Sequence, residues 1–197
     1  MNMPLLPAGR RVAAALALAL AACSAQPAAT PPLAGARIGG PFTLTDQNGR
    51  TVTDSDFAGR YRIVYFGYTF CPDVCPVDVQ NISAALKLVE AKDAALGKRI
   101  VPIFVTVDPA RDTPAVLKKF TAAFHPRLVG LTGSAEAIAK TAKEYGIYYA
   151  RGAGTADGYM MDHSRQIYLF GPDGKPLALL PEGPPQAIAD EVTKWVH

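Results

Sequence analysis

The sequence predicts an α/β fold in which a mostly parallel central sheet is flanked by helices. Apolar, β-branched runs alternate with helical patterns along the chain. Two runs, 63–67 and 100–107, contain almost no polar residue, as expected of central parallel strands that are buried on both faces. Strand–turn–strand patterns near the two ends predict an N-terminal β-hairpin and an antiparallel C-terminal strand pair.

The first half of the domain is defined by one turn signal and one proline. Asn48-Gly49 is a strong signal for a tight hairpin turn. Pro76 fits the first turn of a helix, where a missing backbone N–H costs nothing. The elements expected here are strands 42–44, 51–53, 63–67 and 100–107, with a helix from the Pro76 region to about Glu90.

The second half is divided by cap residues. Asp112 or Thr113 caps a helix with Pro114 in its first turn, Ser134 caps the next helix, and Gly146 ends it. The elements expected here are helix 112–124, strand 128–131, helix 135–145, strand 147–150, a flexible Gly-rich loop 152–158, strand 166–170, a Pro-Asp-Gly turn, strand 177–180 and helix 185–195.

Cys71 and Cys75 lie between strand 63–67 and the helix that follows. Two cysteines four residues apart on a helix face the same side, so their sulfurs can bind one metal ion or form a disulfide. A helix N-terminus also favours the thiolate, which is the reactive species. A purely structural disulfide is disfavoured, because so short a loop removes little chain entropy. A cysteine pair on the first strand-to-helix turn of such a sheet is the thioredoxin arrangement.

The N-terminus is typical of a bacterial lipoprotein signal. Arg10 and Arg11 precede a short apolar run that ends in Leu-Ala-Ala-Cys at Cys23. This predicts a signal peptide at 1–22, an acylated Cys23 with a Pro/Ala-rich tether at 23–37, and one folded domain at 38–197. The alternative is ordinary signal cleavage near Ala25. We expect a lipid-anchored domain in the bacterial cell envelope that faces the periplasm or the exterior.

The net charge of the chain argues against a nucleic-acid partner. The formal net charge is +3, and without Arg10 and Arg11 it falls to about +1. No lysine or arginine cluster stands out in the remaining chain. The sequence therefore gives no electrostatic basis for binding nucleic acid.

Several short motifs, in order along the chain, together resemble the Sco/SenC family. They are Gly-Tyr-Thr-Phe-Cys-Pro-Asp-Val-Cys-Pro at 67–76, Val-Asp-Pro at 107–109, Arg-Asp-Thr-Pro at 111–114 and Asp-His-Ser at 162–164. The resemblance implies a thioredoxin-like fold and copper binding by Cys71, Cys75 and His163. It also implies that the protein delivers copper to the dinuclear copper site of cytochrome c oxidase, or prepares the thiols of that site.

The residues favour copper independently of the resemblance. Two thiolates and one imidazole suit Cu(I) and can also hold Cu(II), whereas a structural zinc site normally has four protein ligands. Asp162 and Asp108 are candidates to orient the histidine or tune the thiols. We expect His125 and His197 to be uninvolved, and Met160 and Met161 to serve packing, although a thioether can also bind copper.

A second function remains open on the same residues. A thiol–disulfide oxidoreductase would use Cys71 as the attacking thiolate and Cys75 as its partner to reduce a disulfide of another protein. The first interpretation describes a metallochaperone rather than an enzyme. Both require a thioredoxin-like reductant, because a Cys71–Cys75 disulfide cannot bind copper through thiolates. Further expected partners are the copper-bearing subunit of cytochrome c oxidase, a second copper chaperone and, through the lipid anchor, the membrane.

Overall fold

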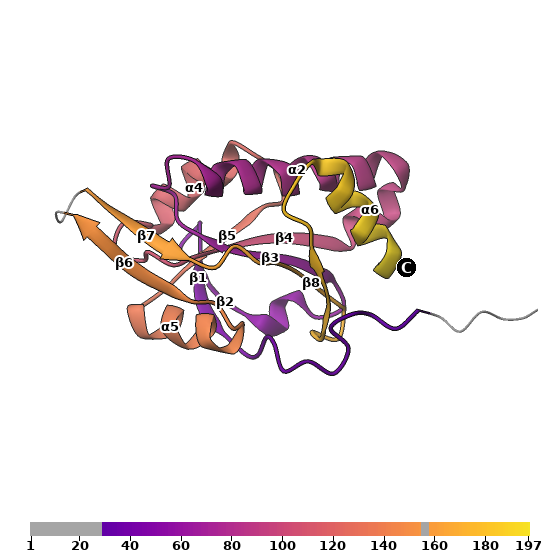
Figure 1. Cartoon of the computed structure of the whole chain (residues 1–197), viewed down its shortest axis with the longest axis horizontal. Coiled ribbons are helices and arrows are strands. Elements are labelled where there is room, and N and C mark those ends of the chain that lie inside the picture. The colour runs from indigo at the N-terminus through magenta and orange to yellow at the C-terminus, as the bar shows by residue number, and fades with distance from the viewer. Residues whose placement is uncertain (1–28, 155–157) are drawn as a thin grey trace, which may run out of the picture. The chain divides into compact units, whose positions relative to one another are not determined.

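The computed structural model describes residues 29–154 and 158–197, and Pro31–His197 form one unit (Figure 1). The expected signal peptide and the acylated Cys23 lie outside the described residues. No helix in the described part of the chain is long and apolar enough to cross a bilayer.

A seven-stranded sheet forms the centre of the unit, in the order β2-β1-β5-β4-β3-β8-β9. Only the β5-β4-β3 core is parallel, and each strand added at either side pairs antiparallel. The sheet is therefore mixed, because the N-terminal hairpin and the C-terminal strand pair both extend it. The strands are β1 (Thr43–Asp46), β2 (Thr51–Thr53), β3 (Tyr61–Gly67), β4 (Ile100–Thr106), β5 (Val129–Thr132), β8 (Ile167–Phe170) and β9 (Pro176–Leu180).

Helices cover both faces of this sheet. Figure 1 shows α2, α4 and α6 on one face and α5 on the other. The helices are α2 (Val74–Lys92), α3 (Ala94–Lys98), α4 (Pro114–Ala122), α5 (Ala135–Glu144) and α6 (Pro185–Trp195), with a 3₁₀ turn, η2 (Asp54–Phe57). The expected caps are present, since the side chains of Thr113 and Ser134 accept hydrogen bonds from the first turns of α4 and α5.

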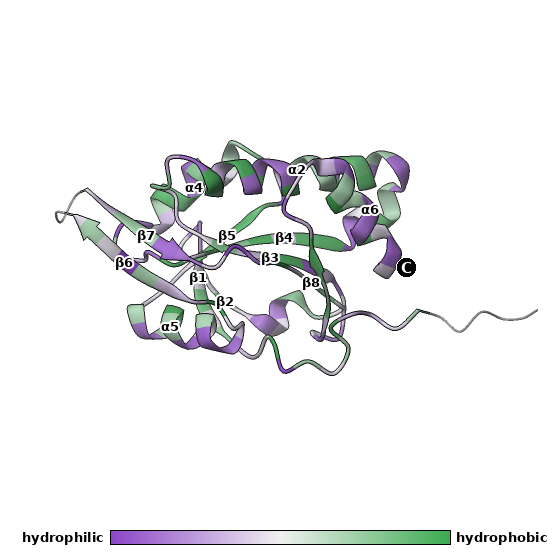
Figure 2. Ribbon diagram, in the orientation of Figure 1, coloured by the Kyte–Doolittle hydropathy of each residue, from purple (hydrophilic) through white to green (hydrophobic). Residues whose placement is uncertain are grey.

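The hydrophobic core lies along β3 and β4. All seven residues of each strand are buried, and Figure 2 shows the central strands as hydrophobic while the helices alternate in polarity. β3 is hydrogen-bonded to β4 on one side and to β8 on the other. The segment that follows β3 therefore starts from the best-buried part of the molecule.

A separate two-stranded sheet was not predicted as such. β6 (Tyr149–Gly154) pairs antiparallel with β7 (Tyr159–His163), so part of the expected Gly-rich loop is a strand. Glycine and alanine are poor strand formers, and the pairing with β7 supplies the order that their propensity does not. This hairpin projects away from the main sheet (Figure 1). Its last residue is His163.

Candidate metal centre

The turn after β3 presents the two cysteines differently from the prediction. α2 begins at Val74, so Cys75 is its second residue while Cys71 lies before the helix. Cys71 precedes Pro72, and a residue before proline is disfavoured in the helical conformation. The pair therefore does not lie on one helical face, as the spacing alone suggested. Cys71 is instead held in a tight turn, with its N–H donating to the Tyr68 carbonyl at 3.4 Å.

The sulfur of Cys71 lies at the N-terminus of α2. The Cys75 N–H donates to the Cys71 Sγ at 3.4 Å, and the side chain of the N-cap residue Asp73 makes no capping bond. Burial acts to raise the pKa of the Cys71 thiol, but the N–H groups of Cys75 and Asp73 outweigh it, so the pKa lies below its ordinary value. These donors and the helix dipole favour the thiolate.

Cys75 is fully buried. Burial raises the pKa of its thiol to about 12, so at neutral pH it carries its proton unless a metal displaces it. Gly67 makes room for this sulfur, because a Cβ at that position would lie 3.3 Å from Cys75 Sγ and 3.0 Å from the rings of Tyr65 and Phe104. The two thiols thus differ in protonation as well as in position.

The tautomer of His163 determines which ring nitrogen faces the buried Cys75. Its Nδ1 lies 2.8 Å from the Ser164 carbonyl oxygen, which can only accept, so Nδ1 carries the proton. Nε2 is left with its lone pair and lies 3.2 Å from Cys75 Sγ. Burial lowers the pKa of His163, so the ring is neutral at pH 7. Edge-on contacts with Tyr65 and Tyr68 fix its plane.

The donor set fits a thiophilic metal ion. Around tetrahedral zinc, with bonds of about 2.3 Å to sulfur and 2.0–2.1 Å to nitrogen, these two donor types would lie roughly 3.5 Å apart. The Cys75–His163 pair is already near that separation. Within residues 29–154 and 158–197, however, no three histidine, cysteine or acidic side chains surround one point as a formed metal site. Cys71, held by the helix N-terminus, would have to turn toward the pair.

Comparison with known proteins identifies the family. Residues 30–197 match the SCO1/SenC family. The chain is 42% identical to protein SenC of Rhodobacter capsulatus over 163 residues, which cover 81% of this chain and 71% of SenC. This chain belongs to the SCO1/SenC family. It spans about half the length of the first curated relatives that it matches.

Solved structures of SCO1/SenC relatives share the fold. The copper-bound structure of Bradyrhizobium japonicum ScoI is 39% identical, with a TM-score of 0.73 over 81% of this chain and 99% of ScoI. BsSco, described as having a disulfide switch and as a member of the Sco family of cytochrome c oxidase assembly proteins, is 27% identical, with a TM-score of 0.62 over 80% of this chain and 92% of BsSco. The predicted thioredoxin-like fold is confirmed, and homologous Sco structures contain copper.

The two aspartates expected to act on the ligands take different places in this SCO1/SenC chain. Asp162 is exposed beside His163, and its charge opposes the burial that lowers the pKa of the imidazole, but His163 Nδ1 donates its hydrogen bond to the Ser164 carbonyl. Asp108 is buried and accepts a hydrogen bond from Tyr159 at 2.7 Å while pairing with Arg111 at 2.5 Å. Asp108 therefore holds the start of β7 rather than the imidazole.

An ion pair between the buried Asp78 and the partly exposed Arg165, which the sequence did not reveal, joins the cysteine helix to the segment after His163. Asp78, one turn beyond Cys75, pairs with Arg165 at 3.0 Å and accepts from the Tyr65 hydroxyl at 2.9 Å. Arg165 lies two residues after His163. The network thus ties the segment that carries the imidazole directly to α2. The only sequence signal was an unassigned acid one turn beyond Cys75.

Asp112 holds the cysteine turn from the opposite side. Its carboxylate accepts hydrogen bonds from the Thr69 N–H at 3.0 Å, the Thr69 hydroxyl at 2.5 Å and the Thr106 hydroxyl at 2.6 Å. Burial raises the pKa of this fully enclosed carboxyl group. Asp112 therefore fixes the turn against the end of β4.

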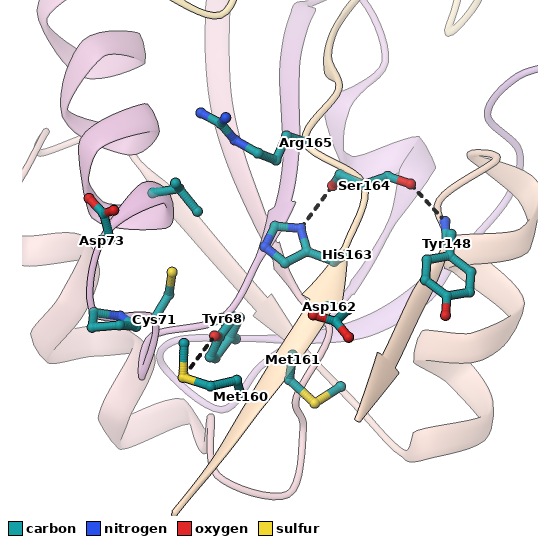
Figure 3. Close-up of a pocket in the computed structure, with 12 residues that line it drawn as sticks. Tyr68, Cys71, Asp73, Tyr148, Met160, Met161, Asp162, His163, Ser164 and Arg165 are labelled. Carbon is teal, nitrogen blue, oxygen red and sulfur yellow. Dashed lines mark hydrogen bonds between the residues drawn. The ribbon is translucent and has the colours of Figure 1, made fainter. Parts of the chain in front are cut away.

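Above the donors lies an open, mostly apolar cavity of about 500 Å³ (Figure 3). Cys71 and His163 both line it, so the site can be approached from outside. The other two histidines lie elsewhere. His125 is buried against Glu90, and His197 is the C-terminal residue. The remaining lining residues are Tyr68, Pro72, Asp73, Val74, Tyr148, Met160, Met161, Asp162, Ser164 and Arg165.

Proposed function

We propose that this chain is a copper-binding assembly factor that delivers copper to, or prepares, the dinuclear copper site of cytochrome c oxidase. Copper is its cargo, held as Cu(I) or Cu(II) by Cys71, Cys75 and His163. The observation that carries the proposal is the 3.2 Å approach of the lone-pair nitrogen of His163 to the Cys75 sulfur. The copper bound to ScoI and the description of the Sco family as oxidase assembly proteins support it.

The three donors suit temporary binding. Two sulfurs and an imidazole match the preference of Cu(I) for soft ligands. Three donors leave one side of the ion open toward the cavity, where a ligand of the recipient can attach before the bonds to this chain break. The protein is thus a metallochaperone rather than an enzyme, with the copper-bearing oxidase subunit as recipient and another copper chaperone as donor.

The oxidoreductase is the second candidate, and the unequal thiols favour it. The Cys71 thiolate would attack a partner disulfide, forming a mixed disulfide and releasing one partner thiolate. Cys75, after losing its proton, would then attack the sulfur of Cys71 in the mixed disulfide. This step forms the Cys71–Cys75 disulfide and releases the second partner thiol. Two electrons pass to the partner, and a thioredoxin-like reductant must restore them. The disulfide switch described for BsSco is consistent with such a cycle.

The proposed location at a membrane of the cell envelope rests on the predicted lipoprotein signal peptide. Acylation of Cys23 would anchor the domain to a membrane of the bacterial cell envelope, facing the periplasm or exterior. Residues 31–37 of the expected tether belong to the domain itself, where the Leu33 N–H donates to the Leu177 carbonyl at 3.0 Å. Detection of a diacyl- or triacyl-modified Cys23 by mass spectrometry would support this. An unmodified mature N-terminus near Ala25 would contradict it.

A Cu(I) titration of the reduced protein tests the proposal. We expect one copper per chain, with binding lost in Cys71→Ser and Cys75→Ser and weakened in His163→Ala. His197→Ala is the matched control and should bind as the wild type does. If His163→Ala supports oxidase assembly normally while either cysteine variant fails, the oxidoreductase function replaces copper delivery.

A further inference from the structure

Met160 brings a third type of sulfur to the mouth of the site. It lies on β7, three residues before His163, and its side chain is 47% exposed. Strand alternation alone would direct it away from the imidazole. The side chain nevertheless lines the same cavity as Cys71 and His163 (Figure 3). An exposed thioether is therefore placed beside the two donors that the cavity makes accessible.

Tyr68 connects this thioether to the cysteine turn. Its hydroxyl donates to Met160 Sδ at 3.7 Å, and the same hydroxyl interacts with the Cys71 sulfur. The ring of Tyr68 meets the His163 ring edge-on, with 5.9 Å between centroids. One buried tyrosine thus contacts the thioether, the outer thiol and the imidazole. The neighbouring Met161 also lines the cavity, but it is partly buried and packs against the hydrophobic core.

We propose that the Met160 thioether is an additional, exchangeable copper ligand at the open side of the site. The inference rests on the proposed copper-binding function. Thioethers are soft donors that suit Cu(I), and they carry no proton and no charge at any pH. Met160 can therefore attach to copper and leave it without a proton transfer.

This assigns an order to ligand exchange. A thiolate or thioether of the recipient forms its bond to copper as the bond to Met160 breaks, and the oxidation state of copper does not change. The more strongly bound donors of this chain then leave in later steps. The recipient is thus recognised as a protein that offers a sulfur ligand able to enter the cavity.

Selenium labelling can test this directly, because the chain contains only four methionines, at positions 1, 3, 160 and 161. The reduced full chain would be prepared with selenomethionine as two variants, Met161→Leu and Met160→Leu, and loaded with one equivalent of Cu(I). Met1 and Met3 are common to both samples. X-ray absorption at the selenium edge should show copper near selenium in Met161→Leu, and this signal should be absent in Met160→Leu.

Competition with bicinchoninate adds a second readout. The apparent Cu(I) dissociation constant should rise roughly three- to tenfold in Met160→Leu, as expected for one weak soft ligand, and stay unchanged in Met161→Leu. If both variants bind copper normally and neither shows selenium next to copper, Met160 is not a ligand. The proposed copper-binding function would then still stand. Failure of both variants and the wild type to bind Cu(I) would instead overturn the proposed function.

Discussion

The segment after β3, which runs into α2, and the β6–β7 hairpin carry the proposed copper ligands, but they are held in opposite ways. The turn follows a strand in which all seven residues are buried and paired on both sides. The strands of the hairpin pair only with each other, Met160 on β7 is 47% exposed, and Tyr148, directly before β6, is 65% exposed. The core thus positions the two sulfurs, whereas a few side-chain contacts position the imidazole.

Those contacts lie at the two ends of the hairpin. At its base, Ser164 and Tyr148 exchange hydrogen bonds of 2.9 and 3.1 Å. Near its tip, the Tyr159 ring stacks on Arg111, which also donates to the Tyr159 carbonyl at 3.0 Å. Local opening of such a segment costs less free energy than global unfolding. If His163 binds copper as proposed, its bond to the metal can therefore open while the thiols stay in place.

The strongest test breaks the link between the two regions. In Asp78→Ala the Tyr65 hydroxyl and Arg165 lose a buried partner, and we expect copper affinity to fall about a hundredfold, the upper end of the range for residues that orient metal ligands. The free energy of unfolding should fall by about 2–4 kcal/mol, because Arg165 is partly exposed and keeps Glu182. Competition titration and denaturant unfolding measure the two effects.

Glu182→Ala is the matched control, because it removes the exposed partner of the same arginine. It should change the stability by less than about 0.5 kcal/mol and leave copper binding intact. Wild-type affinity in Asp78→Ala would show that the hairpin holds the imidazole without this link.

The second test concerns the sulfurs alone. Backbone donors lower the pKa of Cys71, while burial raises that of Cys75 to about 12. Even after allowing for the weaker nucleophilicity of the more acidic thiol, Cys71 should react with iodoacetamide at least about thirtyfold faster at pH 7. Its rate should rise with pH and level off below the pH expected of an ordinary cysteine. Peptide mass spectrometry over a pH series measures both rates, and equal rates would contradict the assignment of Cys71 as the attacking thiol.

The smallest effect is expected at the tip of the hairpin. Tyr159→Phe removes the hydrogen bond to Asp108 but keeps the ring against Arg111. We expect about a tenfold loss of copper affinity with a stability change near 1 kcal/mol. Hydrogen exchange should accelerate at β6 and β7 and stay unchanged at β3.

Tyr148→Phe serves as the control, since its side chain is mostly in solvent. Uniformly faster exchange throughout the domain of Tyr159→Phe would show that the hairpin is not an independent unit.

The sequence was sufficient where local signals decide the structure. Buried runs predicted β3 and β4, and Thr113, Ser134 and Gly146 marked helix ends that the structure confirms. The position of the cysteine pair between a buried strand and a helix could also be predicted, because the strand is a continuous apolar run and the helix has a clear helical pattern. At the cysteine pair, the spacing was misleading for Cys71, because Pro72 delays the start of α2.

The contacts that position His163 could not be predicted from local sequence patterns. Asp78 and Arg165 are 87 residues apart, and Tyr159 and Asp108 are 51 apart. No periodicity connects such pairs, and β6 contains glycines that argue against a strand. The sequence motif named the histidine, but only the folded chain shows that a carbonyl oxygen, rather than Asp162, orients its ring.

The hydrogen bond from the Cys75 backbone to the Cys71 sulfur has a consequence for release. If the Cys71 sulfur turned toward a bound copper ion, as the proposed function requires, the N–H at the start of α2 would lose its acceptor and would regain it when the ion left. Part of the binding free energy would thereby be cancelled within the protein itself. Such a protein would hold its metal less tightly than its ligands alone would allow, which is what the proposed delivery of copper requires.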